Sequence, residues 1–376
     1  MRSINLPYAK SIANRTLLLK AVHGEPLPEP DALWSDDMHA MKWVLEPTLG
    51  SDGWHTAAAG PTGTAYRFGM AYWAAQPGAR VRLTADERLR NRPILPLVHA
   101  LQSMGARIES DPLGWRIEGV TLSGGAVAVD ARQSSQFASA LLLSSPCFAE
   151  PVRLELPQGL ASAPYLAMTE AMHGAGARSW PPERDWSSAF VVLAAVGLTG
   201  VSIRLPGLAM NSIQGDSRCT QWGSELGYTL QVEASGLAAH SAPWPTAPWI
   251  VAFGETPDLA MPAIVAAALG GRSGRATGLQ TLNAKESPRL DATAELLTRL
   301  GCRVRSGSDW LEWDAPLALP TEWLELDSYD DHRMAFCAAL VSLRCPVVLR
   351  GSAAVAKSFP NFWSEWGLSD RLRFRS

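Results

Sequence analysis

The feature that most limits the fold is a recurring unit, in which a helix-like stretch ends at a glycine and an alternating segment follows. The two clearest copies are LVHALQSMGARIES, with Gly105, and ELLTRLGCRVRS, with Gly301. Glycine is favoured where a helix ends, because it adopts the left-handed backbone conformation without a steric penalty. The alternation that follows predicts a half-buried strand. Each copy therefore indicates a helix that leads into a strand.

Looser copies extend the pattern over much of the chain, at Gly50, Gly176 and Gly227. Their spacing of roughly 50 to 75 residues is irregular and far longer than a solenoid repeat. We therefore expect several αβ units folded into compact layers. Chance similarity among amphipathic helices is the alternative explanation.

The length of 376 residues is sufficient for two hydrophobic cores. The segment SWPPERDWSS, residues 179–188, is rich in Pro, Trp and charge and is the best candidate for a crossing between domains. The apolar run from Phe190 to Val196 predicts a buried strand or helix, and no run reaches the roughly 18 to 20 residues of a membrane span.

The charge balance bears on the class of partner. The chain has 33 Lys+Arg against 36 Asp+Glu, a net charge of −3. Phosphate binding along a nucleic acid needs a basic surplus, so nucleic acid is not expected as the main partner. The five cysteines are scattered without a CxxC pair, and the N-terminus lacks the pattern of a secretory or transit signal. We therefore expect a cytoplasmic protein without a zinc ribbon or a disulfide framework.

Seven segments bring Lys, Arg or Ser to a loop or to the start of a predicted helix. A helix N-terminus offers free N–H groups and a partial positive charge, which suit an anion. Taken singly, each segment is also typical of a solvated helix end or a serine N-cap. The segments are KSIANR (10–15), GPTGTAYRF (60–68), RLRNRPI (88–94), RQSSQF (132–137), NAKESPRL (283–290), DDHRMAF (330–336) and KSFPNFW (357–363).

In the fifth segment, Lys285, Glu286 and Arg289 are predicted to lie within one helical turn. A Lys–Arg pair at this spacing repels itself unless an anion lies between the two side chains. Glu286 is either a general acid/base or a salt-bridge partner. In the sixth segment, His332 and Arg333 begin a helix that soon becomes apolar, although a lone histidine is more often structural than catalytic.

Together the seven segments indicate a site for small polyanions. Burying an unpaired charge costs several kcal/mol, so cations gathered in one cleft would hold it open until anions bind.

Read in order, these segments carry a long series of motifs between Leu6 and Trp363. The series is LPxxKSxxNR, SDD, GTAxR, RPI, SSQF, SxPY, DxSSA, NSxQGD, PDxAM, KESxR, DHRM and KSFP. In this order the chain resembles the 5-enolpyruvylshikimate-3-phosphate (EPSP) synthase family of 3-phosphoshikimate 1-carboxyvinyltransferases.

The resemblance implies an α/β fold, a two-domain inside-out α/β barrel of repeated βαβαββ units with the active site in the interdomain cleft. The first domain would comprise residues 15–184, and the second would comprise 1–14 plus 185–376. Each would contain three repeats, with the N-terminal edge of the second domain shortened. The family is mostly monomeric, so a monomer is expected.

The resemblance also implies the reaction. Phosphoenolpyruvate would transfer its enolpyruvyl group to the 5-hydroxyl of shikimate 3-phosphate through a tetrahedral intermediate, with release of phosphate and without cofactor or metal. Glu286 would protonate the methylene carbon, and Asp258 or Lys10 would take the hydroxyl proton.

The binding residues are carried over by motif position. The implied shikimate 3-phosphate residues are Lys10, Ser11, Arg15, Ser134, Ser135, Gln136, Ser162, Tyr165, Asp258 and Lys285. The implied phosphoenolpyruvate residues are Lys10, Gly63, Arg92, Gln136, Arg289, Arg333 and Lys357. Among them, the three serines with Lys285 would hold the shikimate phosphate, and Arg15 would hold its carboxylate.

The chain departs from the family pattern at several motif positions. Pro61 stands where an Asn is usual, Tyr8 and Ala9 precede the first Lys-Ser, and Pro288 interrupts the KESxR motif. Thr281 replaces an Asn, for which Asn283 could substitute only from a shifted position. These changes predict altered kinetics, but every charged residue of the implied site is retained.

Three alternatives remain open from the sequence. The sister enzyme that acts on UDP-N-acetylglucosamine uses a reactive cysteine in its first domain, where this chain has only Cys147 in an apolar context. An enolpyruvyl transferase for a related cyclitol phosphate would carry the same motifs. A non-catalytic anion-binding protein of this fold is the third alternative.

Overall fold

The structure is a computed structural model that describes residues 1–157, 159–176 and 179–375. The chain divides into two compact units. The first unit is Lys10–Pro182, and the second unit combines Met1–Ala9 with Glu183–Ser376. These divisions follow residues 9 and 182, where the sequence placed them after residues 14 and 184. The later division falls inside the SWPPERDWSS segment.

The first unit has a five-stranded sheet of order β2-β3-β4-β6-β5 and a parallel pair, β7-β8. Its strands are β2 Thr48–Leu49, β3 His55–Ala58, β4 Arg80–Thr84, β5 Arg107–Asp111, β6 Gly114–Glu118, β7 Gly125–Ala128 and β8 Val152–Glu155. Its helices are α1 Lys10–Val22, α2 Asp36–Leu45, α3 Gly63–Ala74, α4 Glu87–Arg90, α5 Leu95–Ser103, α6 Gln136–Ser144, η1 Ser145–Cys147 and α7 Ala163–Gly174.

The second unit has three sheets, of orders β1-β9-β11-β10, β12-β13-β15-β14 and β16-β17-β18. The strands are β1 Arg2–Ser3, β9 Ile203–Pro206, β10 Tyr228–Glu233, β11 Gly236–Ser241, β12 Trp249–Ala252, β13 Gly274–Thr277, β14 Val304–Ser306, β15 Trp310–Trp313, β16 Leu324–Asp327, β17 Val347–Arg350 and β18 Leu372–Arg375. The α-helices are α8 Trp186–Thr199, α9 Ala260–Leu269, α10 Arg289–Arg299, α11 His332–Ser342 and α12 Phe362–Trp366. The short 3₁₀ helices are η2 Gly215–Trp222, η3 Pro257–Leu259, η4 Leu282–Ala284 and η5 Ser352–Lys357.

One strand arrangement recurs in both units. In β12-β13-β15-β14 the first two strands are parallel and the others pair antiparallel. The sheet β1-β9-β11-β10 and the strands β3-β4-β6-β5 of the first unit pair in the same way. Helices connect the parallel strands β3 and β4 and the parallel strands β12 and β13, so the chain order in these two sheets is that of a βαβαββ unit. In the third sheet the whole first unit and α8 lie between β1 and β9, and the 3₁₀ helix η2 precedes β10. The predicted α/β class with repeated βαβαββ units is thus confirmed.

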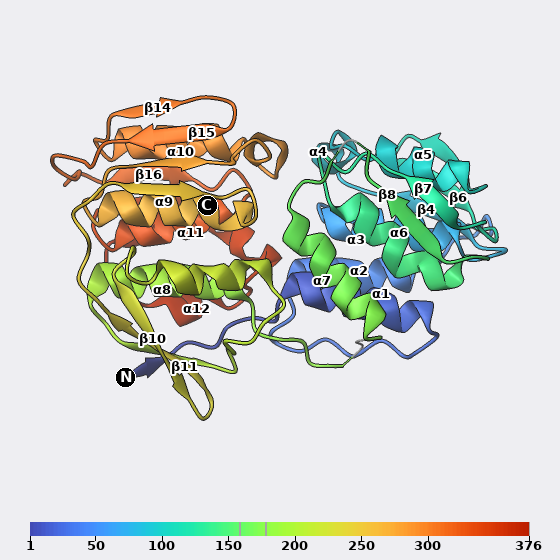
Figure 1. Ribbon diagram of the computed structural model, residues 1–376, viewed down its shortest axis with the longest axis horizontal. Helices are drawn as coiled ribbons and strands as arrows, with labels where there is room; N and C mark the ends of the chain where they lie inside the picture. Colours follow the sequence, from blue (N-terminus) through green and yellow to red (C-terminus); the bar gives the residue numbers. More distant parts are fainter. Residues whose placement is uncertain (158, 177–178, 376) are drawn as a thin grey trace. The chain divides into compact units, whose positions relative to one another are not determined.

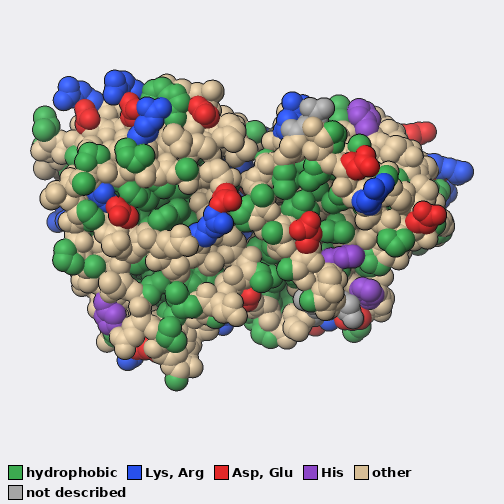
Figure 2. Space-filling model, viewed as in Figure 1, with side chains coloured by type: hydrophobic (Ala, Val, Ile, Leu, Met, Phe, Trp, Pro, Cys, Tyr) green, Lys and Arg blue, Asp and Glu red, His purple; other side chains and the backbone are tan. Residues whose placement is uncertain are grey.

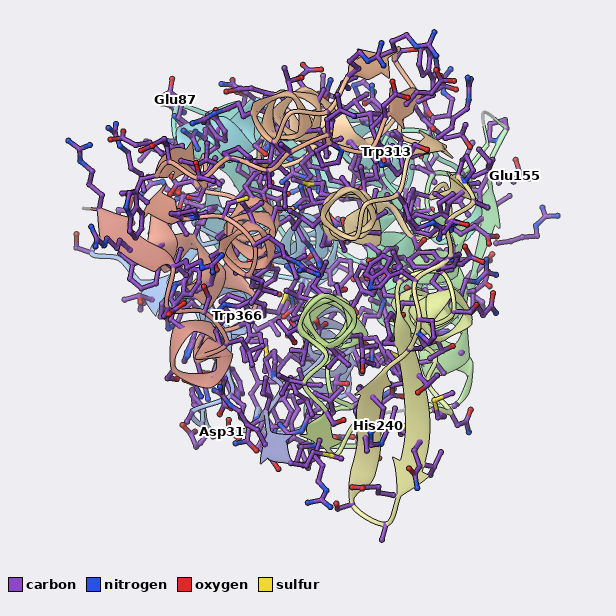
Figure 3. The ribbon with its side chains drawn as sticks, turned by 90° about the vertical axis from the view of Figure 1, so that its left-hand side faces the viewer. Asp31, Glu87, Glu155, His240, Trp313 and Trp366 are labelled. Carbon is purple, nitrogen blue, oxygen red and sulfur yellow. The ribbon has the colours of Figure 1, made fainter. Side chains whose placement is uncertain are left out.

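Three apolar helices form the interior of the second unit. Every residue of α9 and α11 is buried, and so is every residue of α8 except Thr199. Figure 1 shows these helices side by side, and Figure 3, which views them nearly end-on, shows the strands around them. A helix that is covered on all sides is apolar all round. The run Phe190–Val196 is therefore a helix, one of the two forms that the sequence allowed.

The glycine pattern is confirmed at its two clearest positions. Gly105 has φ +100° between α5 and β5, and Gly301 has φ +88° between α10 and β14. Gly227 also has positive φ before β10, but a 3₁₀ helix rather than an α-helix precedes it.

The pattern fails at Gly50. Helix α2 ends at Leu45, and the strand β2 precedes the glycine. Pro47 explains the difference, because proline cannot continue a helix. Gly176 has φ +58° after α7, but part of the strand expected after it lies at residues 177 and 178, outside the described residues.

The N-terminal strand belongs to the second unit. Strand β1 pairs in parallel with β9. The backbone N–H of Asn5 donates to Glu365 Oε2 at 3.0 Å, and its amide donates to Oε1 at 3.1 Å. The start of the chain is therefore fixed both to the strand after α8 and to α12, near the C-terminus.

Within the described ranges, no helix has the length and apolar character needed to cross a membrane. On the face seen in Figure 2, acidic and basic side chains are interspersed.

Candidate functional site

The fifth segment does not form the helical turn that the sequence predicted. Lys285 follows η4 in an extended conformation, Pro288 is the N-cap, and α10 begins only at Arg289. A residue before proline is disfavoured in the helical region, so Ser287 cannot continue a helix through this point. Lys285 and Glu286 therefore lie on a loop that leads into α10.

Arg289 is the centre of a charged cluster in the second unit. Its guanidinium donates to both carboxylate oxygens of Asp331, at 2.7 and 3.1 Å, and to Asp258 at 3.0 Å. A fourth contact joins it to Glu286 at 2.9 Å. Burial disfavours the charged form, but the three carboxylates outweigh it and raise the pKa of Arg289. Arg289 is thus a fixed cation in the centre of the cluster.

Asp331 holds Arg289 in place and was missed by the sequence analysis. Its side chain is fully buried and also accepts from Ser287 Oγ at 2.9 Å and from the backbone N–H of Arg333 at 2.9 Å. The last contact makes it the N-cap of α11. An Asp just before an apolar helix is a known N-cap signal, which could have identified this residue.

The anion between Lys285 and Arg289 is a protein carboxylate. Asp258, on η3, lies 3.4 Å from Lys285 Nζ and 3.0 Å from Arg289 Nη1. Arg333 Nη2 lies 3.8 Å from the other oxygen of Asp258. Burial alone would raise the pKa of Asp258, but Lys285, Arg333 and Arg289 together hold it well below its usual range. Asp258 is therefore an ionised carboxylate that bridges three cations.

Glu286 joins Arg289 to the C-terminal part of the chain. Its Oε2 accepts from Arg289 at 2.9 Å, and its Oε1 lies 3.5 Å from Lys357 Nζ. Lys357 ends η5, about 70 residues further along the chain. Two cations therefore fix the position of the Glu286 carboxylate.

Arg333 is the least satisfied cation of the cluster. Its side chain is 1% exposed, and Nε and Nη1 are buried without a hydrogen-bond partner among the described residues. Arginine stays charged at neutral pH, so a buried guanidinium needs acceptors. The cluster contains four cations, Lys285, Arg289, Arg333 and Lys357, against three carboxylates, Asp258, Glu286 and Asp331. This arrangement can accept a further anion.

The first unit has its own polar group of residues, which begins at Lys10 on the first turn of α1. Lys10 Nζ lies 3.1 Å from Asp37 Oδ2. The other oxygen of Asp37 accepts from Thr62 Oγ1 at 2.9 Å, which fixes the carboxylate. The sequence analysis did not assign Asp37 a role, although it lies in the SDD motif. Lys10 is therefore oriented by a carboxylate that is itself anchored.

Arg15 is held by neutral acceptors. Its guanidinium donates to Thr169 Oγ1 at 2.7 Å and to the Ser11 carbonyl at 2.7 Å. Its Nη2 contacts the Tyr165 carbonyl at 3.0 Å and Ser139 Oγ at 3.4 Å. Burial lowers the pKa of Arg15 to about 10. These contacts use four of the five N–H donors of the side chain, so at most one N–H is left for a ligand.

Gly63 begins α3 close to two arginines. A Cβ added at Gly63 would lie 2.9 Å from Arg67 Nη1 and 3.4 Å from Arg92 Nη1. Arg67 donates to the side-chain carbonyl of Gln136 and to the Pro93 carbonyl, the latter at 3.0 Å. Arg67 was left out of the predicted site, although its position four residues after Gly63 places both on one helix face.

The predicted serines lie at the starts of two helices. Ser134 Oγ accepts from the backbone N–H of Gln136 at 3.3 Å, and Ser135 is the N-cap of α6. Ser162 is the N-cap of α7 with φ +53°, a left-handed conformation that is unusual for a non-glycine residue. Strain of this kind is concentrated at functional sites.

The predicted residues are thus divided between the two units. The first unit carries Lys10, Ser11, Arg15, Gly63, Arg92, Ser134, Ser135, Gln136, Ser162 and Tyr165. The second unit carries Asp258, Lys285, Glu286, Arg289, Arg333 and Lys357.

Two sequence departures have local explanations. Asn283, which was considered as a substitute ligand, accepts from the backbone N–H of Leu290 at 2.9 Å and donates to Asp291 at 3.1 Å. It thereby caps the start of α10. Thr281 is the N-cap of η4.

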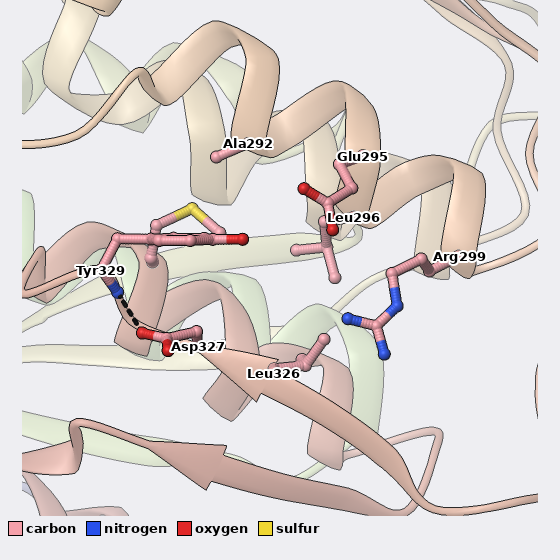
Figure 4. A pocket seen from close by; sticks show the side chains of 8 residues that line it. Ala292, Glu295, Leu296, Arg299, Leu326, Asp327 and Tyr329 are labelled. Carbon is pink, nitrogen blue, oxygen red and sulfur yellow. Dashed lines mark hydrogen bonds between the residues drawn. The ribbon is translucent and has the colours of Figure 1, made fainter.

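A small hollow lies between α10 and the end of β16, apart from both groups of predicted residues. Figure 4 shows Tyr329, Asp327, Glu295 and Arg299 around it, and apolar side chains complete its lining. The backbone N–H of Tyr329 donates to Asp327 at 2.7 Å. None of the predicted site residues lines this hollow.

Cys147 lacks the environment of a reactive thiol. It is half-buried, and the Gln76 amide donates to its sulfur at 3.3 Å. Burial raises the pKa of Cys147, which reduces the thiolate needed for nucleophilic attack.

The chain is similar in sequence and in fold to proteins of one family. The family EPSP synthase (3-phosphoshikimate 1-carboxyvinyltransferase) matches residues 54–178 and 175–366. The 3-phosphoshikimate 1-carboxyvinyltransferase of Syntrophobacter fumaroxidans is 33% identical, over 96% of this chain and 95% of that protein. That of Bacteroides fragilis is 32% identical, over 96% and 94%. Among solved structures, an EPSP synthase from Acinetobacter baumannii shares the fold with a TM-score of 0.70 and 20% identity, over 98% of this chain and 97% of that one.

Proposed function

This chain belongs to the EPSP synthase family, the 3-phosphoshikimate 1-carboxyvinyltransferases, and on that premise we propose that it transfers the enolpyruvyl group of phosphoenolpyruvate to the 5-hydroxyl of shikimate 3-phosphate. Phosphate is the second product. The observation that carries this proposal is Arg333, a buried guanidinium in a cluster of four cations and three carboxylates, two of whose nitrogens have no acceptor among the described residues. A small polyanion supplies the missing acceptors.

The second-unit cluster binds phosphoenolpyruvate in this proposal. Arg333 and Lys357 contact the phosphate and carboxylate, and Arg289 orients Glu286 beside them. Cations around the phosphate stabilise the charge that develops as it leaves. Arg92 and the backbone of Gly63, which lie together in the first unit, complete the binding of this substrate. Lys10 and Gln136 contact both substrates.

The first unit binds most of shikimate 3-phosphate. Ser134, Ser135 and Ser162 lie at helix starts, where hydroxyls and backbone N–H groups suit a phosphate. Lys285 supplies a full charge to the same phosphate. Ser11 and Tyr165 contact the ring. Arg15 offers its remaining N–H to the carboxylate and, because it is otherwise fully engaged, acts mainly as a rigid support.

The proton transfers follow from the positions of the carboxylates. In the addition step the 5-oxygen bonds to C2 of phosphoenolpyruvate, and Glu286 gives a proton to C3. In the elimination step C3 returns a proton to Glu286 as the bond from C2 to the phosphate oxygen breaks. The 5-hydroxyl proton leaves to Asp258 or to Lys10.

The low pKa of Asp258 disfavours it as the final acceptor of this proton, and Lys10 can accept the proton only as a neutral amine, because an ammonium group has no free electron pair. A carboxylate bridging three cations is a weak base, and it is better suited to hydrogen-bond the 5-hydroxyl. Holding both reactants in this geometry can lower the barrier by roughly 7–11 kcal/mol without a cofactor. We also propose that the protein is a monomer and that it acts in the cytoplasm.

The test is phosphate release from phosphoenolpyruvate with each of two acceptors, shikimate 3-phosphate and UDP-N-acetylglucosamine. We expect turnover only with shikimate 3-phosphate, and the same rate in Cys147→Ser, because this thiol has no role. Turnover only with UDP-N-acetylglucosamine, or loss of turnover in Cys147→Ser, would contradict the proposal.

A further inference from the structure

Asp216 is a buried carboxyl group in the second unit that the proposed site does not include. It lies on η2 and is only 4% exposed. Ser187 Oγ, from the first turn of α8, donates to Oδ2. The other oxygen, Oδ1, is enclosed without a hydrogen-bond donor among the described residues. A buried carboxylate oxygen without a donor disfavours the ionised form.

The charged groups that face Asp216 come from three other elements and from η2 itself. Asp258 lies on η3, Asp185 is the N-cap of α8, and Arg333 lies on the first turn of α11. On η2 itself, Cys219 interacts with the carboxyl. Burial raises the pKa of Asp216 to about 7, with further increases from Asp258 and Asp185 that Arg333 and Ser187 partly offset.

Arg333 and the ionised form of Asp216 carry opposite charges, and each lacks some of its hydrogen-bond partners among the described residues. Within the part of the chain that the structure describes, the guanidinium has two nitrogens without acceptors, and the carboxyl has one oxygen without a donor. With Asp216 ionised, four carboxylates balance the four cations of the cluster. With Asp216 protonated, the cluster keeps one net positive charge, which favours an incoming anion.

We propose that Asp216 is a positioning residue for phosphoenolpyruvate, which balances the charge of Arg333 before the substrate binds and takes up a proton from solvent when the substrate arrives. This inference rests on the proposed function, because it assigns phosphoenolpyruvate to Arg333. Ser187 donates to the carboxyl in both protonation states, so the side chain keeps its place. The exchange lets a buried arginine be neutralised first by the protein and then by its substrate.

The proposal has a defined pH dependence. Below about pH 7 Asp216 is already protonated, and substrate binding needs no proton. Above this value each binding event takes up one proton, so kcat/KM for phosphoenolpyruvate falls by up to about tenfold per pH unit. The value of kcat does not fall in the same way with rising pH, because Asp216 is protonated in the complex with phosphoenolpyruvate.

The experiment measures kcat and kcat/KM for phosphoenolpyruvate between pH 6 and pH 9 at saturating shikimate 3-phosphate. The variants are Asp216→Asn, which keeps the shape and one oxygen acceptor for Ser187, and the control Asp314→Asn, which removes an exposed carboxylate. We expect the alkaline fall of kcat/KM in the wild type and the control, and its loss in Asp216→Asn. An equal fall in all three proteins would overturn the proposal.

A second variant covers the case in which Asp216→Asn does not fold. Ser187→Ala keeps the carboxyl but removes the donor that favours its ionised form. The fall of kcat/KM should therefore move to higher pH. An unchanged position would count against Asp216 as the titrating group.

A direct measurement separates this inference from the proposed function, since it needs no turnover. Infrared difference spectra at pH 8, with and without saturating phosphoenolpyruvate, should show the C=O band of a newly protonated carboxyl in the wild type and not in Asp216→Asn. If the wild-type protein releases phosphate but the band is absent, the inference about Asp216 is contradicted and the proposed function is not. Failure of phosphate release with shikimate 3-phosphate would contradict the proposed function.

Discussion

The two units hold their cations in different ways. In the first unit Arg15 is surrounded by hydroxyls and carbonyls, and Lys10 is paired with an anchored carboxylate. In the second unit carboxylates separate the cations, and Asp258 alone contacts three of them. Neutral acceptors fix a side chain without changing the net charge of the site. Carboxylates also fix it, but they leave a charge balance that a bound anion or a proton can alter.

This contrast suggests a division of labour. The first unit provides a template in which Arg15 is held by neutral acceptors. The second unit provides the groups that respond to charge, including Glu286 and Asp216. The predictions below test this contrast, from the largest expected effect to the smallest.

The largest effect is expected for Glu286→Gln. This change removes the proton donor but keeps a side chain of the same shape beside Arg289 and Lys357, so kcat should fall roughly 10²- to 10⁴-fold. Phosphate release measures the loss. Glu295→Gln, on α10 but outside the charged cluster, is the matched control and should retain activity. A variant as active as the wild type would remove Glu286 from the mechanism.

The next effect concerns the buried carboxylate of the second unit. Asp331→Asn leaves Arg289 without its main ionised partner, which should lower the free energy of unfolding by about 3–5 kcal/mol. Asp37→Asn, in the first unit, should cost less, because Lys10 can reach solvent. Urea denaturation gives both values. Equal losses would show that the two units do not differ in this respect.

A smaller effect is expected where the acceptor is neutral. Thr169→Val removes the hydroxyl that accepts from Arg15 Nε and leaves that buried donor unsatisfied, at a cost of about 1–3 kcal/mol. Thr298→Val removes an exposed hydroxyl that bonds only its own helix, so its stability should stay close to wild type. If Thr169→Val were as damaging as Asp331→Asn, neutral and charged partners would be equivalent here.

The smallest effect is expected at Gly63. The Cβ of Gly63→Ala would lie 2.9 Å from Arg67 Nη1 and 3.4 Å from Arg92 Nη1, so the ends of both side chains must shift. Because both contacts are with the ends of side chains and not with the backbone, KM for phosphoenolpyruvate should rise only about three- to tenfold, which is roughly 1 kcal/mol. KM for shikimate 3-phosphate should change less. A rise confined to shikimate 3-phosphate would argue against the placement of Gly63.

Local sequence signals predicted much of the framework of the site. The helices that begin at Lys10, Gly63, Gln136 and His332 start where the sequence indicated. Such starts depend on neighbouring residues, so a local pattern is sufficient to locate them. The same applies to the glycines that precede strands.

The carboxylates that hold the cations could not be predicted in the same way. Asp331 contacts Arg289 across 42 residues of chain, and Asp37 lies 27 residues from Lys10. Their roles arise from tertiary contacts, to which no local spacing points. Pro288 is a local signal for the loop at Lys285 and Glu286, because a residue before proline is disfavoured in the helical region. The spacing of the charges alone predicted a helical turn there.

The attachment of strand β1 has a consequence for how the chain is made. The first nine residues belong to a unit whose other residues begin at Glu183. On the ribosome, residues 10–182 can assemble as soon as they emerge. Strand β1 must wait until β9 has been made. The hydrogen bond from Asn5 to Glu365 must wait until a still later part of the chain has been made. Synthesis therefore places β1 in the chain long before the residues that pair with it.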